Sequence, residues 1–166
     1  MTDTRNKYRQ SAPAYYISRW RFTLELQDHR IRNAIDQLHR QVDIDLYVLA
    51  LRNLIRAVNS AKCPTRNGEI CQALDAFYKA VPAWKNVRDF LEHFDEYSQG
   101  KGRLQKNNNA VVYGPYYAEQ ESCDPDGNNI VKNYFLTFGE GNQIDVTTST
   151  REAVVLADIA LSNCAK

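Results

Sequence analysis

Several features that mark common protein classes are missing from this 166-residue sequence. No stretch approaches 18 apolar residues, so a membrane span is not predicted. The first ten residues are polar and lack an apolar segment, which excludes a secretory signal peptide there. A net charge of +1 gives no general attraction to nucleic acid, so any contact with RNA would depend on a local basic patch. Together these absences predict a cytoplasmic protein.

Patterns for metal, cofactor and covalent chemistry are missing too. The four cysteines are scattered, and the seven residues between Cys63 and Cys71 do not make a zinc-knuckle spacing. Without a signal peptide, reduced thiols are favoured over disulfides. Phosphate loops, dinucleotide fingerprints and serine or cysteine nucleophile motifs do not occur. We therefore expect no metal site and no cofactor.

The first hundred residues carry apolar side chains at helical spacing, and they predict four helices. The first is expected over residues 11–41. The second is expected to begin at an Asp43 cap and to end near Pro64, because proline cannot continue a helix. The third covers residues 70–81, and the fourth covers residues 83–98 and is closed by Gly100.

The first helix has a competing interpretation. Residues 17–26 also alternate between apolar and polar side chains, as a strand would. The helical spacing is favoured because it continues to Leu38 without a turn residue. This interpretation places six side chains in the core: Ile17, Trp20, Leu24, Ile31, Leu38 and Val42.

The pattern changes after Gly102. Residues 110–117, 130–138 and 143–147 are rich in tyrosine, valine, isoleucine and phenylalanine, which favours strands. A capping box at Ser149–Glu152 then predicts a final helix through Leu161. The expected fold is mainly α, of the α+β class. It comprises a disordered N-terminus (1–10), a helical bundle (11–104), and a three-stranded antiparallel β-meander with a closing helix packed on the bundle (105–166).

The fourth predicted helix carries the strongest functional signal. Arg88 and His93 lie five residues apart on it. An arginine can hold a phosphate through a planar fork of donors, and a histidine can transfer a proton near neutral pH. At 100 degrees per residue the two side chains diverge by about 140 degrees around the axis. A joint site therefore needs a second helix, most simply the same helix of a second copy.

With four helices and this arginine–polar–x3–histidine pattern, the chain resembles the HEPN superfamily over residues 14–99. The matching residues are Arg88, Asp89 and His93. Active members are metal-independent endoribonucleases that work as dimers, and many are toxins or antiviral effectors. Others serve as non-catalytic binding or dimerisation modules. Some toxins place a tyrosine two residues after the histidine. Asp95 holds that place here, and Tyr97 follows four after.

The resemblance implies a homodimer, an RNA substrate and, for a toxin, an antitoxin partner. Arg88 would stabilise charge on the phosphoryl oxygens, and His93 would move the proton at the 2′-hydroxyl or the leaving oxygen. Asp89 completes the motif, and Tyr97 would orient His93. Three basic residues in the following loop are expected to bind RNA: Lys101, Arg103 and Lys106.

Plainer interpretations stand beside the catalytic one. Arg88 can pair with Glu92, and Asp89 with His93, as solvated contacts one helical turn apart. A second pair, Arg32 and His39, is interpreted as the solvated face of one long helix. The alternative function is a non-catalytic helical binding or dimerisation module. In the catalytic case, a dimer burying about 1,200 Å² or more would bring two copies of the fourth helix together through Phe90 and Tyr97.

Overall fold

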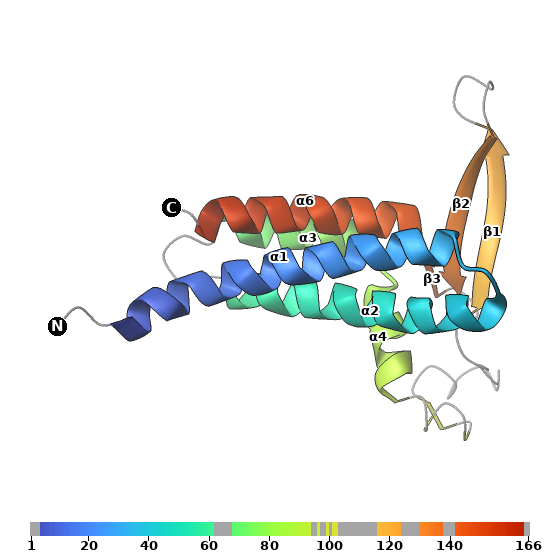
Figure 1. Cartoon of the computed structure of the whole chain (residues 1–166), viewed down its shortest axis with the longest axis horizontal. Helices are drawn as coiled ribbons and strands as arrows, with labels where there is room; N and C mark the ends of the chain where they lie inside the picture. The colour runs from blue at the N-terminus through green and yellow to red at the C-terminus, as the bar shows by residue number, and fades with distance from the viewer. Residues whose placement is uncertain are drawn as a thin grey trace.

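The computed structural model describes residues 4–61, 68–93, 96, 99, 101–102, 116–123, 130–137 and 142–164. Two long helices form an antiparallel pair: α1 (Thr4–Arg32) and α2 (Gln37–Ser60). α3 (Gly68–Ala80) and the C-terminal α6 (Val146–Cys164) run alongside them. The short α4 (Trp84–Glu92) leaves this group at an angle below α2 (Figure 1).

A small antiparallel sheet stands at one end of the helices. Its order is β1-β2-β3, with β1 at Tyr116–Cys123, β2 at Ile130–Thr137 and β3 at Gln143–Asp145. The β1–β2 hairpin projects beyond the helical body, as Figure 1 shows. The predicted mainly helical fold, with an antiparallel sheet and a C-terminal helix, is confirmed. β1 extends to Cys123, beyond the predicted end of the first strand at Tyr117, and residues 110–115 of that prediction lie outside the described residues.

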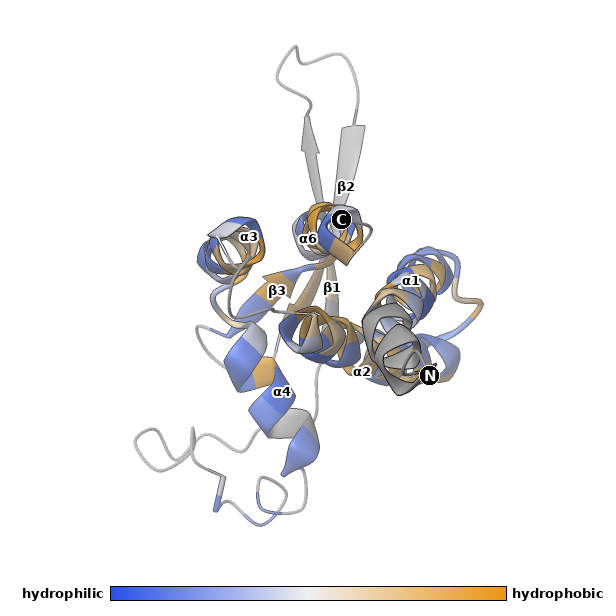
Figure 2. Ribbon diagram, turned by 90° about the vertical axis from the view of Figure 1, so that its left-hand side faces the viewer, coloured by the Kyte–Doolittle hydropathy of each residue, from blue (hydrophilic) through white to orange (hydrophobic). Residues whose placement is uncertain are grey.

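The core lies between α1, α2, α3 and α6, seen end-on in Figure 2. α2 contributes most of its inward side, and Tyr47, Leu51 and Leu54 are fully buried there. α6 contributes small residues, including Ala153, Ala157 and Ala160, which allow neighbouring helices to approach closely. The bundle is therefore completed by α6. α6 contacts α1, α2 and α3.

The apolar residues that recur at helical spacing in the second and third helices are buried, as that spacing predicts. They are Ile44, Tyr47, Val48, Leu51, Leu54, Ile55 and Val58 on α2, and Ile70, Leu74 and Phe77 on α3, with Val81 just after it.

The first helix differs from its prediction at both ends. α1 begins at Thr4, inside the segment expected to be disordered, and it ends at Arg32. Asp36 then caps α2 by accepting the backbone N–H of His39 at 2.8 Å. This break shifts the helical phase. Ile17, Leu24 and Ile31 are buried as predicted, whereas Leu38 and Val42 point away from the core. Helix, not strand, is confirmed for residues 17–26.

The final helix also begins earlier than predicted. β3 leads directly into Val146, and the carboxylate of Asp145 accepts the N–H groups of Thr147 (2.8 Å) and Thr148 (3.3 Å). An aspartate before the first turn satisfies backbone donors that the helix leaves free. Ser149, predicted as the cap, is instead buried within the helix.

Candidate functional site

α4 positions Arg88. Trp84 and Val87 are buried, and they fix the side of the helix that faces α2 and the sheet. The Arg88 side chain is 38% exposed, and its Nε lies 3.7 Å from Glu92 Oε2. Its guanidinium also lies 5.5 Å from the centre of the Trp84 ring. Arg88 is thus held by its own helix, as the plainer interpretation expected.

His93 is not part of α4. It is the C-cap residue, with φ −124° and ψ 34°, and its backbone N–H donates to the Asp89 carbonyl at 3.1 Å. α4 therefore ends at Glu92, before the predicted end at Ser98, and residues 94, 95, 97 and 98 lie outside the described residues. Helices in proteins depend mainly on packing, and the described core contacts of α4 come from Trp84 and Val87 near its start. Because His93 is not helical, the predicted divergence of about 140 degrees between the Arg88 and His93 side chains does not apply.

The imidazole of His93 has an acidic neighbour. Its Nδ1 lies 3.7 Å from Glu96 Oε1, and the side chain is 49% exposed. The predicted pairing with the Asp89 carboxylate is replaced by this contact and by the backbone bond to Asp89. Within the described part of the chain, no ion pair or hydrogen bond joins Arg88 to His93, and each instead pairs with a glutamate of its own segment.

A second guanidinium shares the Glu92 carboxylate. Arg52 of α2 places Nη2 2.5 Å from Glu92 Oε1, while Arg88 approaches Oε2. The positive charge beside α4 is therefore partly neutralised within the chain. This arrangement ties α4 to α2 and leaves less positive potential for a phosphate than Arg88 alone would suggest.

The structure describes few contacts of the remaining predicted site residues. Asp89 is half-buried and has a partner. Lys101 is exposed, and its Nζ donates to Gln99 Oε1 at 3.0 Å. Tyr97, Arg103, Lys106 and the side chain of Phe90 lie outside the described residues.

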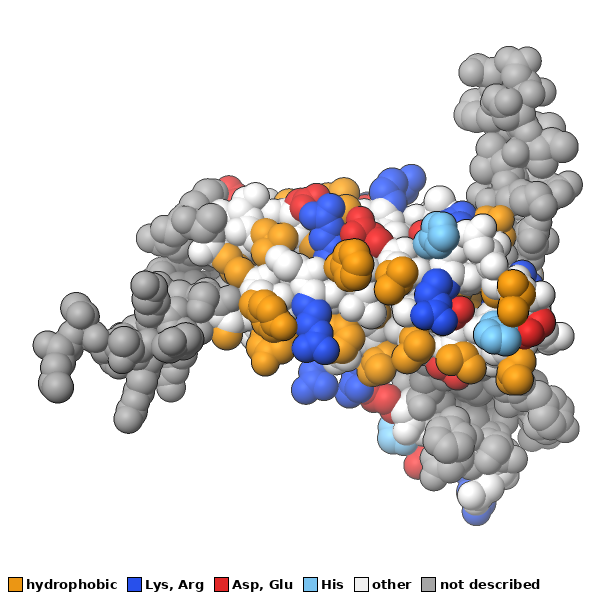
Figure 3. Space-filling model, viewed as in Figure 1, with side chains coloured by type: hydrophobic (Ala, Val, Ile, Leu, Met, Phe, Trp, Pro, Cys, Tyr) orange, Lys and Arg blue, Asp and Glu red, His pale blue; other side chains and the backbone are white. Residues whose placement is uncertain are grey.

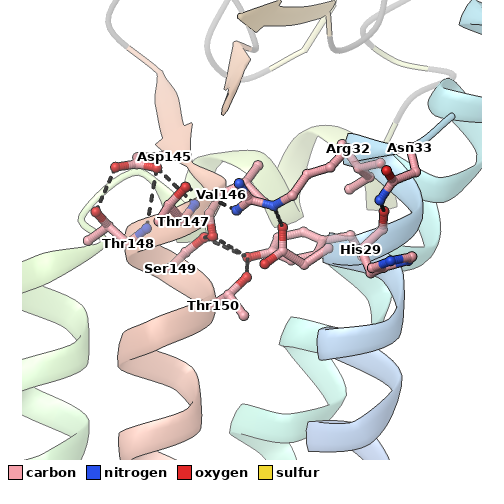
Figure 4. Close-up of polar contacts among 12 residues, drawn as sticks. His29, Arg32, Asn33, Asp145, Val146, Thr147, Thr148, Ser149 and Thr150 are labelled. Atoms are coloured by element: carbon pink, nitrogen blue, oxygen red, sulfur yellow. Dashed lines mark hydrogen bonds and ion pairs between the residues drawn. The ribbon is translucent and has the colours of Figure 1, made fainter. Parts of the chain in front are cut away.

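A polar network that the sequence did not reveal joins α1, α2 and α6 below the sheet (Figure 4). Arg32 Nε donates to Asp28 at 2.6 Å, and Arg32 Nη2 donates to the Thr147 hydroxyl at 3.0 Å. The Arg32 guanidinium also stacks on Tyr134, 4.5 Å from the ring centre. The interpretation of Arg32 and His39 as one helix face is wrong, because the break after α1 separates them.

Tyr47 forms the buried half of this network. Its hydroxyl lies 2.6 Å from Ser149 Oγ and 3.0 Å from Thr150 Oγ1. Burial raises the pKa of the Tyr47 hydroxyl, so it stays a neutral hydrogen-bonding group. These contacts are mutually satisfied and lock α6 and the sheet onto the bundle. The run of hydroxyl residues at 147–150 is the only sequence signal for this junction.

A row of exposed apolar side chains lies on the side of α1 and α2 that faces away from the core. We call it the outward face. Phe22 is 67% exposed there, Leu38 74% and Val42 51%, and Ile35 in the connecting turn is 84% exposed. Figure 3 shows hydrophobic side chains spread along this side of the molecule. The outward face comprises Tyr15, Phe22, Leu26, Ile35, Leu38, Val42, Leu46 and Leu49.

Helical spacing explains why these residues align. Leu38, Val42 and Leu49 follow at intervals of four and seven residues, which places them on one side of α2. Tyr15, Phe22 and Leu26 follow at intervals of seven and four on α1. Eight large apolar side chains on one side of two adjacent helices are more than the scattered exposure usual on a monomer.

Within the described residues, no group of histidine, cysteine, aspartate or glutamate side chains is arranged to hold a metal ion. The described helices include none that is long and apolar enough to cross a membrane. No family model, curated protein or solved structure matches the chain.

Proposed function

We propose that this protein is a non-catalytic helical binding or dimerisation module that works through the outward face of α1 and α2. The observation that carries this proposal is the exposed apolar row on both helices, including Phe22, Leu38 and Val42. Such a surface is unfavourable in water, and covering it with a partner removes that cost.

Burial of the outward face is large enough to offset the cost of association. Full burial of one large apolar side chain contributes roughly 1.5–3 kcal/mol. The eight side chains of the outward face are already partly buried, so covering each of them with a partner would contribute about half of that free energy. The gross gain is on the order of 6–12 kcal/mol, which is comparable with the estimated cost of bringing two proteins together. Affinity then depends on packing and charge across the interface.

A metal-independent endoribonuclease of the HEPN type is the second candidate. Its support is that Arg88 and His93 both reach solvent and lie close together in sequence. Against this candidate, Glu92 contacts Arg88 and Glu96 contacts His93. Both carboxylates add negative charge where an RNA backbone would lie. An antitoxin partner belongs to this second candidate alone.

One cleavage assay separates the two functions. Single-stranded RNA is incubated in EDTA with the wild type, with His93→Ala, and with His29→Ala as a matched histidine control on α1. The module proposal expects no cleavage above buffer from any of the three. Cleavage that disappears in His93→Ala and persists in His29→Ala would overturn it and establish the ribonuclease.

A further inference from the structure

The shape of the outward face restricts what can cover it. It extends from the level of Tyr15 to the Ile35 turn, about 20 residues or roughly 30 Å along α1 at 1.5 Å per residue. It is two helices wide, and packed helices lie about 8–10 Å apart. A single helix would cover only the line between the two rows. Two helices side by side would cover both rows, which approaches the roughly 800 Å² that each partner contributes to a standard interface.

The charges of α1 and α2 are divided between two ends. All acidic residues of the two helices and of the α2 cap lie in the half next to the turn: Glu25, Asp28, Asp36, Asp43 and Asp45. Three of them have close basic partners there, namely Asp28 with Arg32, Asp43 with Arg30, and Asp36 with His39. Glu25 has only a 3.8 Å contact to Arg21, and Asp45 has only a 3.5 Å contact to Gln41.

Arg19 and Arg56 lie farther from the turn than the acidic residues of their helices, and both are exposed. Asp45 and Arg56 are eleven residues apart, three helical turns, and therefore lie on the same side of α2. The half next to the turn also holds Arg21, Arg30, Arg32 and Arg40, but the two acidic side chains with the weakest contacts, Glu25 and Asp45, lie nearer the turn than Arg19 and Arg56 do. A surface of this kind complements itself when it is turned end for end.

We propose that the outward face binds a second copy of this chain, with the two α1–α2 pairs antiparallel about a two-fold axis near Phe22 and Leu46. This inference rests on the proposed binding function and names its partner. Counting residues from that axis places Leu46 against Leu46, and Val42 of one copy within one residue of Leu49 of the other. The same count brings Arg19 to Glu25 of the other copy. A parallel arrangement would instead place like charges together.

The dimer does not unite the α4 segments. α4 packs against α2 through the Arg52–Glu92 pair, to the side of the apolar row. Arg52 is six residues from Leu46, so the two Arg52–Glu92 pairs lie on opposite sides of the axis, about 18 Å apart along the helices. This dimer differs from the one that the sequence predicted, in which Phe90 and Tyr97 would bring two fourth helices together.

Sedimentation equilibrium over a wide concentration range tests the proposal. Leu46→Glu places two carboxylates at the axis and is expected to weaken the dimer by about 100-fold or more. Val155→Glu makes the same chemical change at a 49% exposed position on α6 and should leave the dimer unchanged. Circular dichroism confirms that both variants remain folded.

A charge swap tests the antiparallel direction. Arg19→Glu or Glu25→Arg alone brings like charges together twice per dimer and should weaken it by about 5- to 10-fold. The double variant restores opposite charges and should return the dissociation constant to within about 3-fold of the wild type. Lys79→Glu, an exposed charge reversal on α3, serves as the control.

A wild type that stays monomeric at about 100 µM, or a Leu46→Glu variant that dimerises as well as the wild type, overturns the second-copy inference. An environment-sensitive apolar dye then tests the proposed function separately. Dye bound by the monomer and lost in Leu46→Glu, but not in Val155→Glu, leaves the outward face as a site for a different protein. A monomer that binds no dye overturns both proposals.

Discussion

The outward face of α1–α2 and the exposed side of α4 are opposite kinds of surface. The α4 side carries chemically versatile residues, Arg88 and His93, and each is paired with a glutamate one turn or less away. The outward face carries few ionisable side chains, but its eight apolar side chains remain 39–84% exposed. The comparison shows that residue type alone is a poor guide to function. A surface whose interactions remain unsatisfied is the better indicator of binding.

The largest expected effect separates the inward and outward sides of α2. Leu54 is fully buried and Leu38 is 74% exposed on the same helix. Leu54→Ala should reduce the free energy of unfolding by about 2–5 kcal/mol, because it leaves a cavity in the core. Leu38→Ala should change it by less than about 0.5 kcal/mol. Urea unfolding at a concentration that favours the monomer measures both. Equal losses would mean that Leu38 belongs to the core.

The next effect concerns the junction below the sheet. Asp145→Ala removes the acceptor for the Thr147 and Thr148 N–H groups at the start of α6. Loss of such a cap should reduce the free energy of unfolding by about 1 kcal/mol. Asp145→Asn keeps an acceptor and should retain most of the stability. The same urea titration distinguishes them, and an unaffected Asp145→Ala would show that the cap contributes nothing.

A smaller effect tests the contact that joins the two compared regions. Arg52→Ala removes the Arg52–Glu92 pair between α2 and α4. Both side chains are partly exposed, so the loss should be at most about 1 kcal/mol. The effect should shrink in 0.5 M salt, since screening weakens such pairs. A loss that is independent of salt would point to packing of the arginine stem instead.

The smallest effect is a pH dependence at the turn. Backbone and side-chain hydrogen bonds from His39 lower the pKa of Asp36 below 3.8. A carboxyl group with a lowered folded-state pKa stabilises the fold above its unfolded pKa and loses that contribution as pH falls through the folded value. Asp36→Asn, which also caps helices well, should therefore be less stable than the wild type near neutral pH, and the difference should shrink as pH falls below 3.8 and vanish only below the folded-state pKa of Asp36. Urea titrations at several pH values test this, and a constant difference would contradict it.

The sequence predicted α2 and α3 well because their apolar spacing is unambiguous and each is bounded by a proline or a polar loop. It failed between Asn33 and Asp36, where no glycine or proline marks the break. That single error assigned Leu38 and Val42 to the core and concealed the outward face. The helical periodicity was real, but its phase changed at a turn whose only signal was the Asp36 cap.

The candidate site was less predictable than the fold. Arg88, Asp89 and Glu92 could be placed relative to one another because they share α4. His93 could not, because the helix ends one residue before it. The junction around Tyr47 links residues about a hundred positions apart, such as Tyr47 and Ser149, and helical spacing carries no information on such contacts.

Amide hydrogen exchange measured on dilute and on concentrated protein tests the central claim most directly, because it compares both regions in one experiment. We expect exchange to slow with concentration in peptides covering residues 15–26 and 38–49, and to stay unchanged in residues 84–93. Slowing confined to residues 84–93 would contradict the account and would place the interface at α4, where the ribonuclease hypothesis requires it.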